Sequence, residues 1–389
     1  MDFNFDKIIE RNNTNSVKYD LAEKYNKPAD SIKMWVADMD FPTAPCIVDS
    51  LKQKCEYGIF GYSCLDEEYF TAVQNWMKDR HNFVFEKEWL ITTPGVIFAI
   101  SLAIKALTKE GDGVLIQKPV YYPFYNAIRQ LNRKVVNNPL VLKNGKYEID
   151  FEDFEKKIKT EKPKLFLFCS PHNPGGRVWK KEELLKINEI CLKNKVIVLS
   201  DEIHSDIVFE GNEHTVFANL SKEAQENSII CTSPSKSFNL AGLQISNIFI
   251  ANKKLREKIA FQKFITGYDE ANIMGIVAAT SAYKDGGEWF DGVKNYIWEN
   301  IEFTKDFIEN HSPKIKTIIP EGTYLVWLDF NSFDLSDKEI CKIIADKAKV
   351  WLDEGNIFGE EGKKFMRINV ACPRSILKEA LERICEFFK

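Results

Sequence analysis

The chain has 389 residues, of which 44% are hydrophobic and 28% are charged, and its formal net charge at pH 7 is −4. This length exceeds what one small core usually holds, so we expect a large domain with a smaller companion. The composition is that of an ordinary globular protein. Because the chain is weakly acidic, it has no electrostatic reason to bind nucleic acid or an anionic membrane.

The N-terminus and the cysteines indicate a cytoplasmic protein. Residues 1–16 mix acidic and basic side chains and lack the long apolar core of a signal peptide. No stretch approaches the roughly 18 apolar residues of a membrane span. The nine cysteines include no C-x-x-C pair, and Cys169 and Cys231 lie in apolar runs, so we expect reduced core thiols. No cluster of Cys and His has a spacing suited to a metal, so we expect no metal site.

Short apolar runs alternate with helical patterns through the middle of the chain. The runs that we expect to be strands are 114–119, 164–169, 196–202, 228–233 and 247–252. They are apolar on consecutive residues, which is typical of strands buried on both faces of a parallel sheet covered by helices. Apolar stripes at helical spacing predict helices over 96–108 and 180–195. This alternation predicts an α/β fold.

The C-terminal part of the chain has a different pattern. Residues 324–330 and 365–370 resemble strands, a helix is predicted over 338–353, and a final helix is predicted from Ile376. Separated strands and helices of this kind predict a smaller α+β domain. We therefore expect three parts, which are an N-terminal arm that joins the small domain (1–45), a large domain (46–282) and the small domain (283–389).

Lys236 is the first candidate for chemistry. It lies in the stretch T-S-P-S-K-S, just after an expected buried strand. An isolated lysine is usually a solvated surface charge. Here, however, the strand end is where α/β folds form their sites. The hydroxyls of Ser233, Ser235 and Ser237 could hold a phosphate beside an amine that can form an imine with an aldehyde.

Three other polar residues each allow two interpretations. Asp201 ends an expected strand and either caps the following turn or is a buried anion that pairs with a cationic ring nitrogen, which keeps an electron-accepting ring protonated. Asn173 lies in S-P-H-N-P-G-G, and either belongs to an irregular turn or donates to a phenolic oxygen of a cofactor. Arg367 alternates with apolar neighbours, which fits an exposed strand face or a guanidinium that clamps a substrate carboxylate.

A helix start and an aromatic pair complete the candidates. Gly95 opens the predicted helix over 96–108, where the free amides of Val96 and Ile97 either bind an anion or simply begin the helix. Tyr121 follows a strand and a proline, and is either a core aromatic or a ring stacked flat on a planar cofactor.

The order of these features resembles the marker series of a known family, the fold type I pyridoxal-phosphate enzymes. The series consists of G-V-I (95–97), Tyr121, N-P-G-G (173–176), D-E-I-H (201–204) and S-P-S-K (233–236). Within that family, W-V-A-D-M-D-F-P (35–42), G-Y (61–62) and S-K-S-F-N-L-A-G-L (235–243) are most similar to the MalY/PatB-type cystathionine β-lyases, also called C–S lyases.

The resemblance implies a fold and a cofactor. The fold is a large domain with a mostly parallel seven-stranded sheet covered by helices, plus a smaller α+β domain. The cofactor is pyridoxal 5′-phosphate, carried by Lys236 as an imine. The implied contacts are Asp201 with the pyridine nitrogen, Asn173 and His204 near the phenolic oxygen, Tyr121 on the ring face, and Gly95, Val96, Ile97, Ser233 and Ser235 at the phosphate.

The resemblance also implies where the substrate and a second subunit lie. Arg367 would bind the α-carboxylate of an amino-acid substrate, which Tyr121, Asn173 and the backbone of Val36 and Ala37 would border. Tyr62 would reach the phosphate in the neighbouring subunit. A homodimer with active sites at the subunit interface is therefore expected.

Two residues depart from the pattern of class I aminotransferases, which have tyrosine at the position of His204 and a phosphate-binding arginine at that of Gln244. These departures weaken the case for an ordinary aminotransferase, and the resemblance to the C–S lyases implies an α,β-elimination that yields pyruvate, ammonia and a thiol. An aminotransferase is the alternative, because the same carbanion can be reprotonated on the cofactor. A lyase with a second, regulatory role through protein binding is a further possibility.

Overall fold

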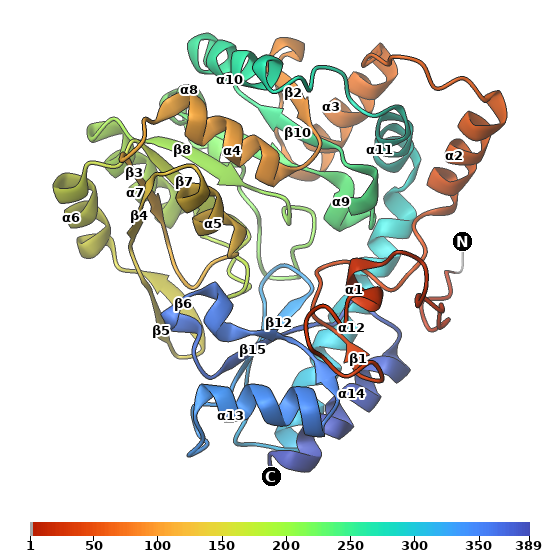
Figure 1. The fold of residues 1–389 in the computed structure, drawn as a ribbon. Helices are drawn as coiled ribbons and strands as arrows, with labels where there is room; N and C mark the ends of the chain where they lie inside the picture. Colours follow the sequence, from red (N-terminus) through yellow and green to blue (C-terminus); the bar gives the residue numbers. More distant parts are fainter. Residues whose placement is uncertain (1–2) are drawn as a thin grey trace.

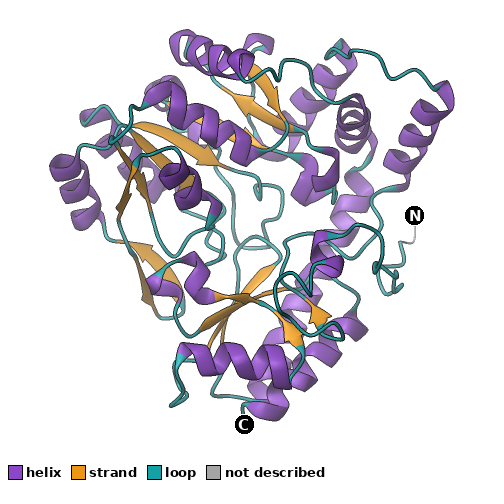
Figure 2. Cartoon of the chain, in the orientation of Figure 1, coloured by secondary structure: helices purple, strands orange, loops and turns teal. Residues whose placement is uncertain are grey.

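The structure, a computed structural model, describes residues 3–389 and is built around a seven-stranded sheet (Figures 1 and 2). The strands follow the order β2-β10-β9-β8-β7-β3-β4. Their bounds are β2 Leu90–Thr93, β3 Gly113–Ile116, β4 Lys134–Asn137, β7 Leu165–Cys169, β8 Ile197–Asp201, β9 Ser228–Thr232 and β10 Ser246–Phe249. The central strands pair in parallel, which confirms the predicted mostly parallel sheet.

The direction of one strand differs from the prediction. Residues 247–252 were expected to join the buried parallel strands, but β10 pairs antiparallel with both β9 and β2. A parallel connection needs a long crossover, usually a helix. The segment between β9 and β10 holds only the short helices α9 (Pro234–Ser237) and η3 (Ala241–Leu243), so the chain returns in the opposite direction.

Helices cover both faces of this sheet, which explains why its strands are apolar on consecutive residues. Leu165, Leu167 and Cys169 of β7 pack in one cluster, together with residues of α4 (Val96–Leu107), α5 (Pro123–Gln130) and α10 (Lys253–Ile265). Phe166 and Phe168 face the opposite cluster, with residues of α6 (Phe151–Glu161) and α7 (Lys181–Lys193). The other helices of this part are α1 Val17–Asp20, α2 Pro45–Tyr57, α3 Glu67–His81, α8 Lys222–Glu226 and α11 Ile273–Asp285.

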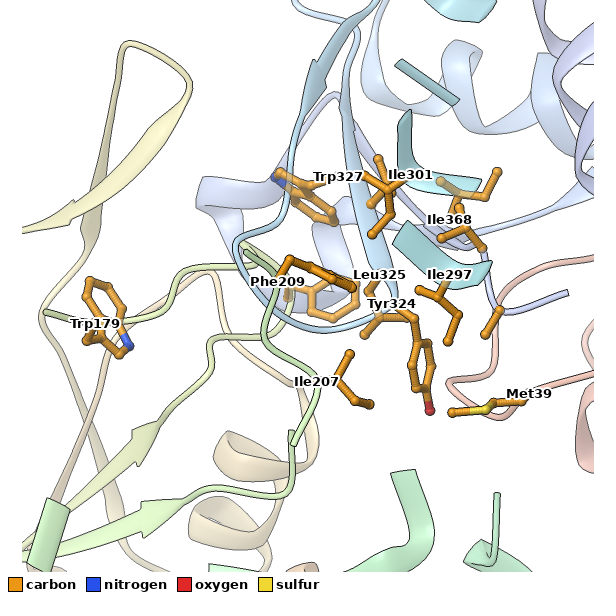
Figure 3. Close-up of a cluster of buried hydrophobic side chains, with 14 of the residues drawn as sticks. Met39, Trp179, Ile207, Phe209, Ile297, Ile301, Tyr324, Leu325, Trp327 and Ile368 are labelled. Atoms are coloured by element: carbon orange, nitrogen blue, oxygen red, sulfur yellow. The ribbon is translucent and has the colours of Figure 1, made fainter. Parts of the chain in front are cut away.

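A second, antiparallel sheet forms near the C-terminus, in the order β11-β12-β15-β14. Its strands are β11 Lys316–Ile318, β12 Leu325–Asp329, β14 Asp353–Glu354 and β15 Phe365–Asn369. Helices α12 (Gly287–His311) and α14 (Arg374–Phe387) contribute to the same core, where Ile297, Ile301, Leu325 and Ile368 lie close together (Figure 3). A hairpin of β5 (Leu140–Lys143) and β6 (Lys146–Ile149) lies between the two sheets in Figure 1.

The helix predicted over 338–353 is wrong in its second half. Helix α13 spans Asp337–Lys342, and after a single π-helical turn the chain forms β13 (Val350–Trp351). Lys349 has a φ of 52°, which ends the helical path. Tertiary pairing decides the conformation that follows, because β13 pairs in parallel with β1 (Ile32–Lys33) of the N-terminal segment.

That pairing brings the N-terminal segment against the C-terminal part of the chain, as expected for an arm. The domain boundaries themselves stay predictions, and the boundary at 282 falls within helix α11. Cys169 and Cys231 are free and buried, as predicted. None of the helices within residues 3–389 is both long and apolar enough to cross a lipid bilayer.

Trp327 of β12 offers a test of the contact between the second sheet and the β5–β6 hairpin. Its ring is fully buried, stacks on Phe365 at a centroid distance of 5.2 Å, and donates from Nε1 to the Tyr147 hydroxyl at 3.1 Å. We expect Trp327→Ala to lower the free energy of unfolding by about 3–5 kcal/mol in urea denaturation. The control Val84→Ala, at a 60% exposed position, should change it by no more than about 0.5 kcal/mol; equal effects would contradict the assignment.

Candidate active site

A cavity of about 160 Å³ lies at the carboxyl ends of the parallel strands β7, β8 and β9, where open α/β sheets bind their ligands. Most of the residues predicted from the sequence line it. They are Ala37, Gly95, Val96, Ile97, Tyr121, Asn173, Asp201, His204, Ser233, Ser235 and Lys236. The cavity therefore brings together residues from the N-terminal segment and from most of the large sheet.

Lys236 lies on α9, directly after β9. Its Nζ donates to the main-chain oxygen of Ala37 at 2.7 Å. Burial lowers the pKa of Lys236 to about 8, while Asp38 opposes that shift and Arg367 adds to it. A lysine with such a pKa is a far better nucleophile and base near neutral pH than a solvated one.

Asp201 ends β8, and its Cα partners on the flanking strands are Cys169 and Cys231. Both interpretations made from the sequence apply, since its Oδ1 accepts from the amide of Ile203 at 3.2 Å and the carboxyl group also lines the cavity. Burial raises the pKa of Asp201 to about 7, although Ile203 and Lys236 oppose the shift. A cation placed beside Asp201 would stabilise its ionised form.

Asn173 is oriented by the residues around it. Its main-chain oxygen accepts from the amide of Tyr121 at 3.0 Å, and its Oδ1 accepts from Nη1 of Arg367 at 2.9 Å. With the side-chain oxygen engaged, the amide nitrogen Nδ2 is the group of Asn173 that can donate into the cavity. This matches the expected contact with a phenolic oxygen.

The start of helix α4 offers donors to an anion at the cavity wall. Helix α4 begins after Gly95 with no side-chain cap, so the first amides of the helix, including those of Val96 and Ile97, have no partner within it. The space next to Gly95 is open, because a Cβ there would meet no atom within 4 Å.

The serines near Lys236 require a correction. The Ser233 hydroxyl donates to the main-chain oxygen of Ile245 at 2.7 Å and accepts from the amide of Ser235 at 3.1 Å, so it is engaged in capping α9. The hydroxyl of Ser237 bonds Asp206 instead of facing the cavity. Of the three hydroxyls, that of Ser235 is therefore the best placed to bind an anion.

Arg367 is buried on β15, with only 2% of its surface exposed, which excludes the exposed strand face considered above. Its Nη1 donates to Asn173, and its Nη2 donates to the main-chain oxygen of Trp35 at 2.8 Å and to Asp353. Its Nε is buried without a partner. An unpaired guanidinium N–H next to the cavity residue Asn173 suits a carboxylate ligand.

The N-terminal segment is held at the cavity by hydrogen bonds from the second sheet. The side-chain amide of Asn369 donates to the main-chain oxygens of Val36 and Asp38, at 2.7 and 2.6 Å. The hydroxyl of Tyr324 donates to the oxygen of Ala37 at 2.9 Å. Ala37 lines the cavity as predicted, but Val36 does not, since it packs against the Trp35 cluster instead.

His204 and Gln244 both line the cavity wall. His204 is buried, its Nδ1 has no partner, and its ring meets Tyr324 edge-on at 5.9 Å. Burial, and then the nearby Lys236 and Arg367, lower the pKa of His204 well below its ordinary value. The imidazole is therefore neutral at physiological pH.

Tyr62, like Val36 and Arg367, is a predicted residue that does not line the cavity. It is fully exposed and does not line the cavity of its own chain. Its assignment to the site of a neighbouring subunit stays a prediction. Conversely, the sequence analysis missed Tyr324 and Asn369, because their role is to hold the main chain of the N-terminal segment and no sequence pattern signals it.

The groups around the cavity fit pyridoxal phosphate. An amine (Lys236), an acid that favours a neighbouring cation (Asp201) and the uncapped start of α4 are arranged around one enclosed space. These groups match the aldehyde, the ring nitrogen and the phosphate of that cofactor, in the roles proposed from the sequence.

Comparisons with known proteins agree with this chemistry. Residues 29–384 match the family described as aminotransferase class I and II. The chain is 42% identical over 98% of both chains to cystathionine beta-lyase PatB of Bacillus subtilis, and 32% identical over 97% of both chains to protein MalY of Escherichia coli. It is also 41% identical to cystalysin of Treponema denticola, whose structure contains pyridoxal 5′-phosphate, with a TM-score of 0.96 over 99% of this chain and 98% of that one.

These similarities confirm the predicted fold type I architecture, the cofactor and the resemblance to the MalY/PatB group. The chain belongs to the aminotransferase class I and II family of pyridoxal-phosphate-dependent enzymes.

Proposed function

We propose that this protein is a pyridoxal-phosphate-dependent C–S β-lyase that cleaves cystathionine- or cysteine-type substrates. With one water, the α,β-elimination yields pyruvate, ammonia and a thiol. The observation that carries the proposal is the cavity in which Lys236, Asp201 and Asn173 converge beside Arg367, in a chain with 42% identity to a cystathionine beta-lyase over nearly its whole length.

Each of the main residues at the cavity has a separate proposed role. When bound, the cofactor supplies an electron-accepting ring. Lys236 would hold the cofactor through its amine, and its free amine would take the α-proton of the substrate as general base. Asp201 would hold a proton on the ring nitrogen, and Asn173 would donate to the phenolic oxygen. Arg367 binds the α-carboxylate and so orients the α-proton toward Lys236.

The lyase is favoured over an aminotransferase by two residues on the cavity wall. Gln244 stands where class I aminotransferases have a phosphate-binding arginine, so the phosphate relies on amides and Ser235. His204, which replaces a tyrosine, is neutral and buried. An elimination needs no second half-reaction with a 2-oxo acid, whereas transamination does.

We also propose that the active unit is a homodimer. Large apolar side chains are exposed along residues 57–65, among them Tyr57, Phe60 and Tyr62, and on helix α10 at Phe261 and Phe264. Exposed apolar surface of this extent on a single chain marks an interaction site. In the dimer, Tyr62 would reach the phosphate of the other subunit. The free cysteines support a reducing, cytoplasmic location.

A pyruvate assay tests the reaction itself. The holoenzyme, incubated with cystathionine, cysteine or cystine and no 2-oxo acid, should release pyruvate and ammonia in equal amounts. Lys236→Ala should abolish turnover, whereas Lys284→Ala, at an exposed lysine paired with Glu68, should leave it unchanged. Strict dependence on an added 2-oxo acid would establish an aminotransferase, and turnover that survives in Lys236→Ala would remove the central assignment.

The lowered pKa of Lys236 predicts how cofactor-free protein takes up its cofactor. The neutral amine is the nucleophile, and the pKa of Lys236 is about 8, so the rate of imine formation should rise with pH and reach half its plateau near pH 8. Absorbance of the imine after mixing with pyridoxal phosphate measures this rate. A midpoint near 10.5, the ordinary value for a lysine, would show that the amine is solvated.

The mass of the protein in solution tests the dimer. Light scattering should give twice 45.0 kDa. Phe264→Glu, which puts a charge on a side chain that is 66% exposed, should yield monomers that bind the cofactor more weakly, because Tyr62 of the second subunit is lost. Val84→Glu changes a side chain that is 60% exposed outside this surface and should stay dimeric. A wild-type monomer would refute the proposal.

A further inference from the structure

Arg367 carries a buried acidic partner on the neighbouring strand. Asp353 of β14 lies opposite Arg367 of β15 in the antiparallel register, and its Oδ2 accepts from Nη2 of Arg367. The side chains are 9% and 3% exposed respectively. Asp353 was not among the residues predicted from the sequence, and it does not line the cavity that Lys236 lines.

The other contacts of Arg367 leave its orientation fixed. Asn173 holds Nη1 at 2.9 Å, the main-chain oxygen of Trp35 holds Nη2 at 2.8 Å, and the ring of Phe358 lies 5.0 Å from the guanidinium carbon. Because three neighbours besides Asp353 define the position of the guanidinium, the carboxylate of Asp353 adds mainly a charge. A substrate carboxylate would therefore approach a guanidinium that already has a counter-anion.

We propose that Asp353 is a specificity-determining residue, an internal counter-anion that competes with the substrate carboxylate for Arg367 and weakens carboxylate binding. The inference rests on the proposed role of Arg367 as the carboxylate-binding residue. Two anions that share one guanidinium in a site shielded from water repel each other. A ligand gains the full attraction of Arg367 only when Asp353 is neutral.

The surroundings of Asp353 allow it to be neutralised. Burial raises its pKa to about 6, against the opposing effect of Arg367, and the nearby Glu354 adds to the rise while Lys27 opposes it. Lys27 is itself paired with Glu354 at 2.8 Å. Tyr121 and Tyr122 also interact with Asp353, and burial raises the pKa of both, so neither competes for its proton near pH 6. Tyr25 and Tyr125 line the same cavity as Asp353.

Asp353 can exchange protons with solvent on the side away from Lys236. Together with Trp35, Tyr122, Trp351 and Glu354 it lines a second cavity, which shares no lining residue with the first. Asp353 therefore faces a space separate from the one that Lys236 lines. A change of pH can reach Asp353 without passing through the substrate site.

Propionate is a suitable probe, because it has a carboxylate but no amine that could react with the cofactor. Calorimetric titration of the holoenzyme between pH 5 and 8 should show wild-type affinity rising about tenfold as the pH falls through about 6, since protonation of Asp353 removes the competing anion. Asp353→Asn keeps an oxygen near Nη2 but no charge. It should bind propionate about tenfold more tightly than wild type at pH 7.5, and its affinity should not rise as the pH falls through about 6.

Glu354→Gln is the matched control, because it removes one negative charge from the adjacent residue, which is paired with Lys27. It should keep the wild-type affinity at pH 7.5, and the midpoint of its pH profile should move to lower pH, because Glu354 adds to the raised pKa of Asp353. In steady-state assays, Asp353→Asn should lower KM with kcat unchanged. If Asp353→Asn does not fold, the wild-type profile decides alone, and affinity that does not rise as the pH falls through 6 overturns the proposal.

Different results would overturn the role of Asp353 and the role of Arg367 on which it depends. If Arg367→Gln binds propionate as well as wild type does, Arg367 is not the carboxylate site and the proposed function loses that residue. If Arg367→Gln loses binding while Asp353→Asn matches wild type at every pH, only the role of Asp353 is overturned.

Discussion

The site depends on the hydrogen bonds that hold the N-terminal segment against β15. Residues 35–38 form no strand, so their main-chain oxygens need partners from elsewhere once they are buried. Arg367 donates to the oxygen of Trp35, and Asn369 donates to those of Val36 and Asp38. Lys236 and Tyr324 both donate to the oxygen of Ala37. The side chains that hold this segment, Lys236 among them, therefore also form or adjoin the wall of the cavity.

This arrangement also places the carboxylate of Asp38 near Lys236. Asp38, held beside the cavity by Asn369, opposes the fall in the pKa of Lys236. Arg11 binds Asp38 at 2.9 Å, and the buried Lys18 lies 3.4 Å from it, which keeps the pKa of Asp38 low despite its burial. A buried carboxylate left without such partners would be costly. The N-terminal segment therefore contributes an anion that opposes the fall in the pKa of Lys236.

The sequence predicted what depends on local chemistry and missed what depends on tertiary contacts. The buried strands and the residues at their ends, such as Asp201 and Lys236, were predictable because an apolar run followed by a polar residue marks the carboxyl edge of a sheet. The conformation at Val350 was set by pairing with Ile32, far away in the chain. Ser233 lines the cavity, but its hydroxyl also caps helix α9, a role that the sequence did not distinguish from binding a ligand. Asp353 gave no signal, since its importance comes only from its register with Arg367.

The protonation states around the cavity favour a single base. His204 lies near Lys236 and Arg367, and its low pKa leaves it unable to deliver a proton near pH 7. Burial raises the pKa of Tyr121 and of Cys169, so both keep their protons. Asp201 has the proposed role of pairing with the ring nitrogen. Among the described residues of this wall, Lys236 alone has both the position and a pKa suited to moving the α-proton. An elimination requires only the removal of the α-proton before the thiol leaves. A cavity wall with a single suitable base is consistent with a lyase.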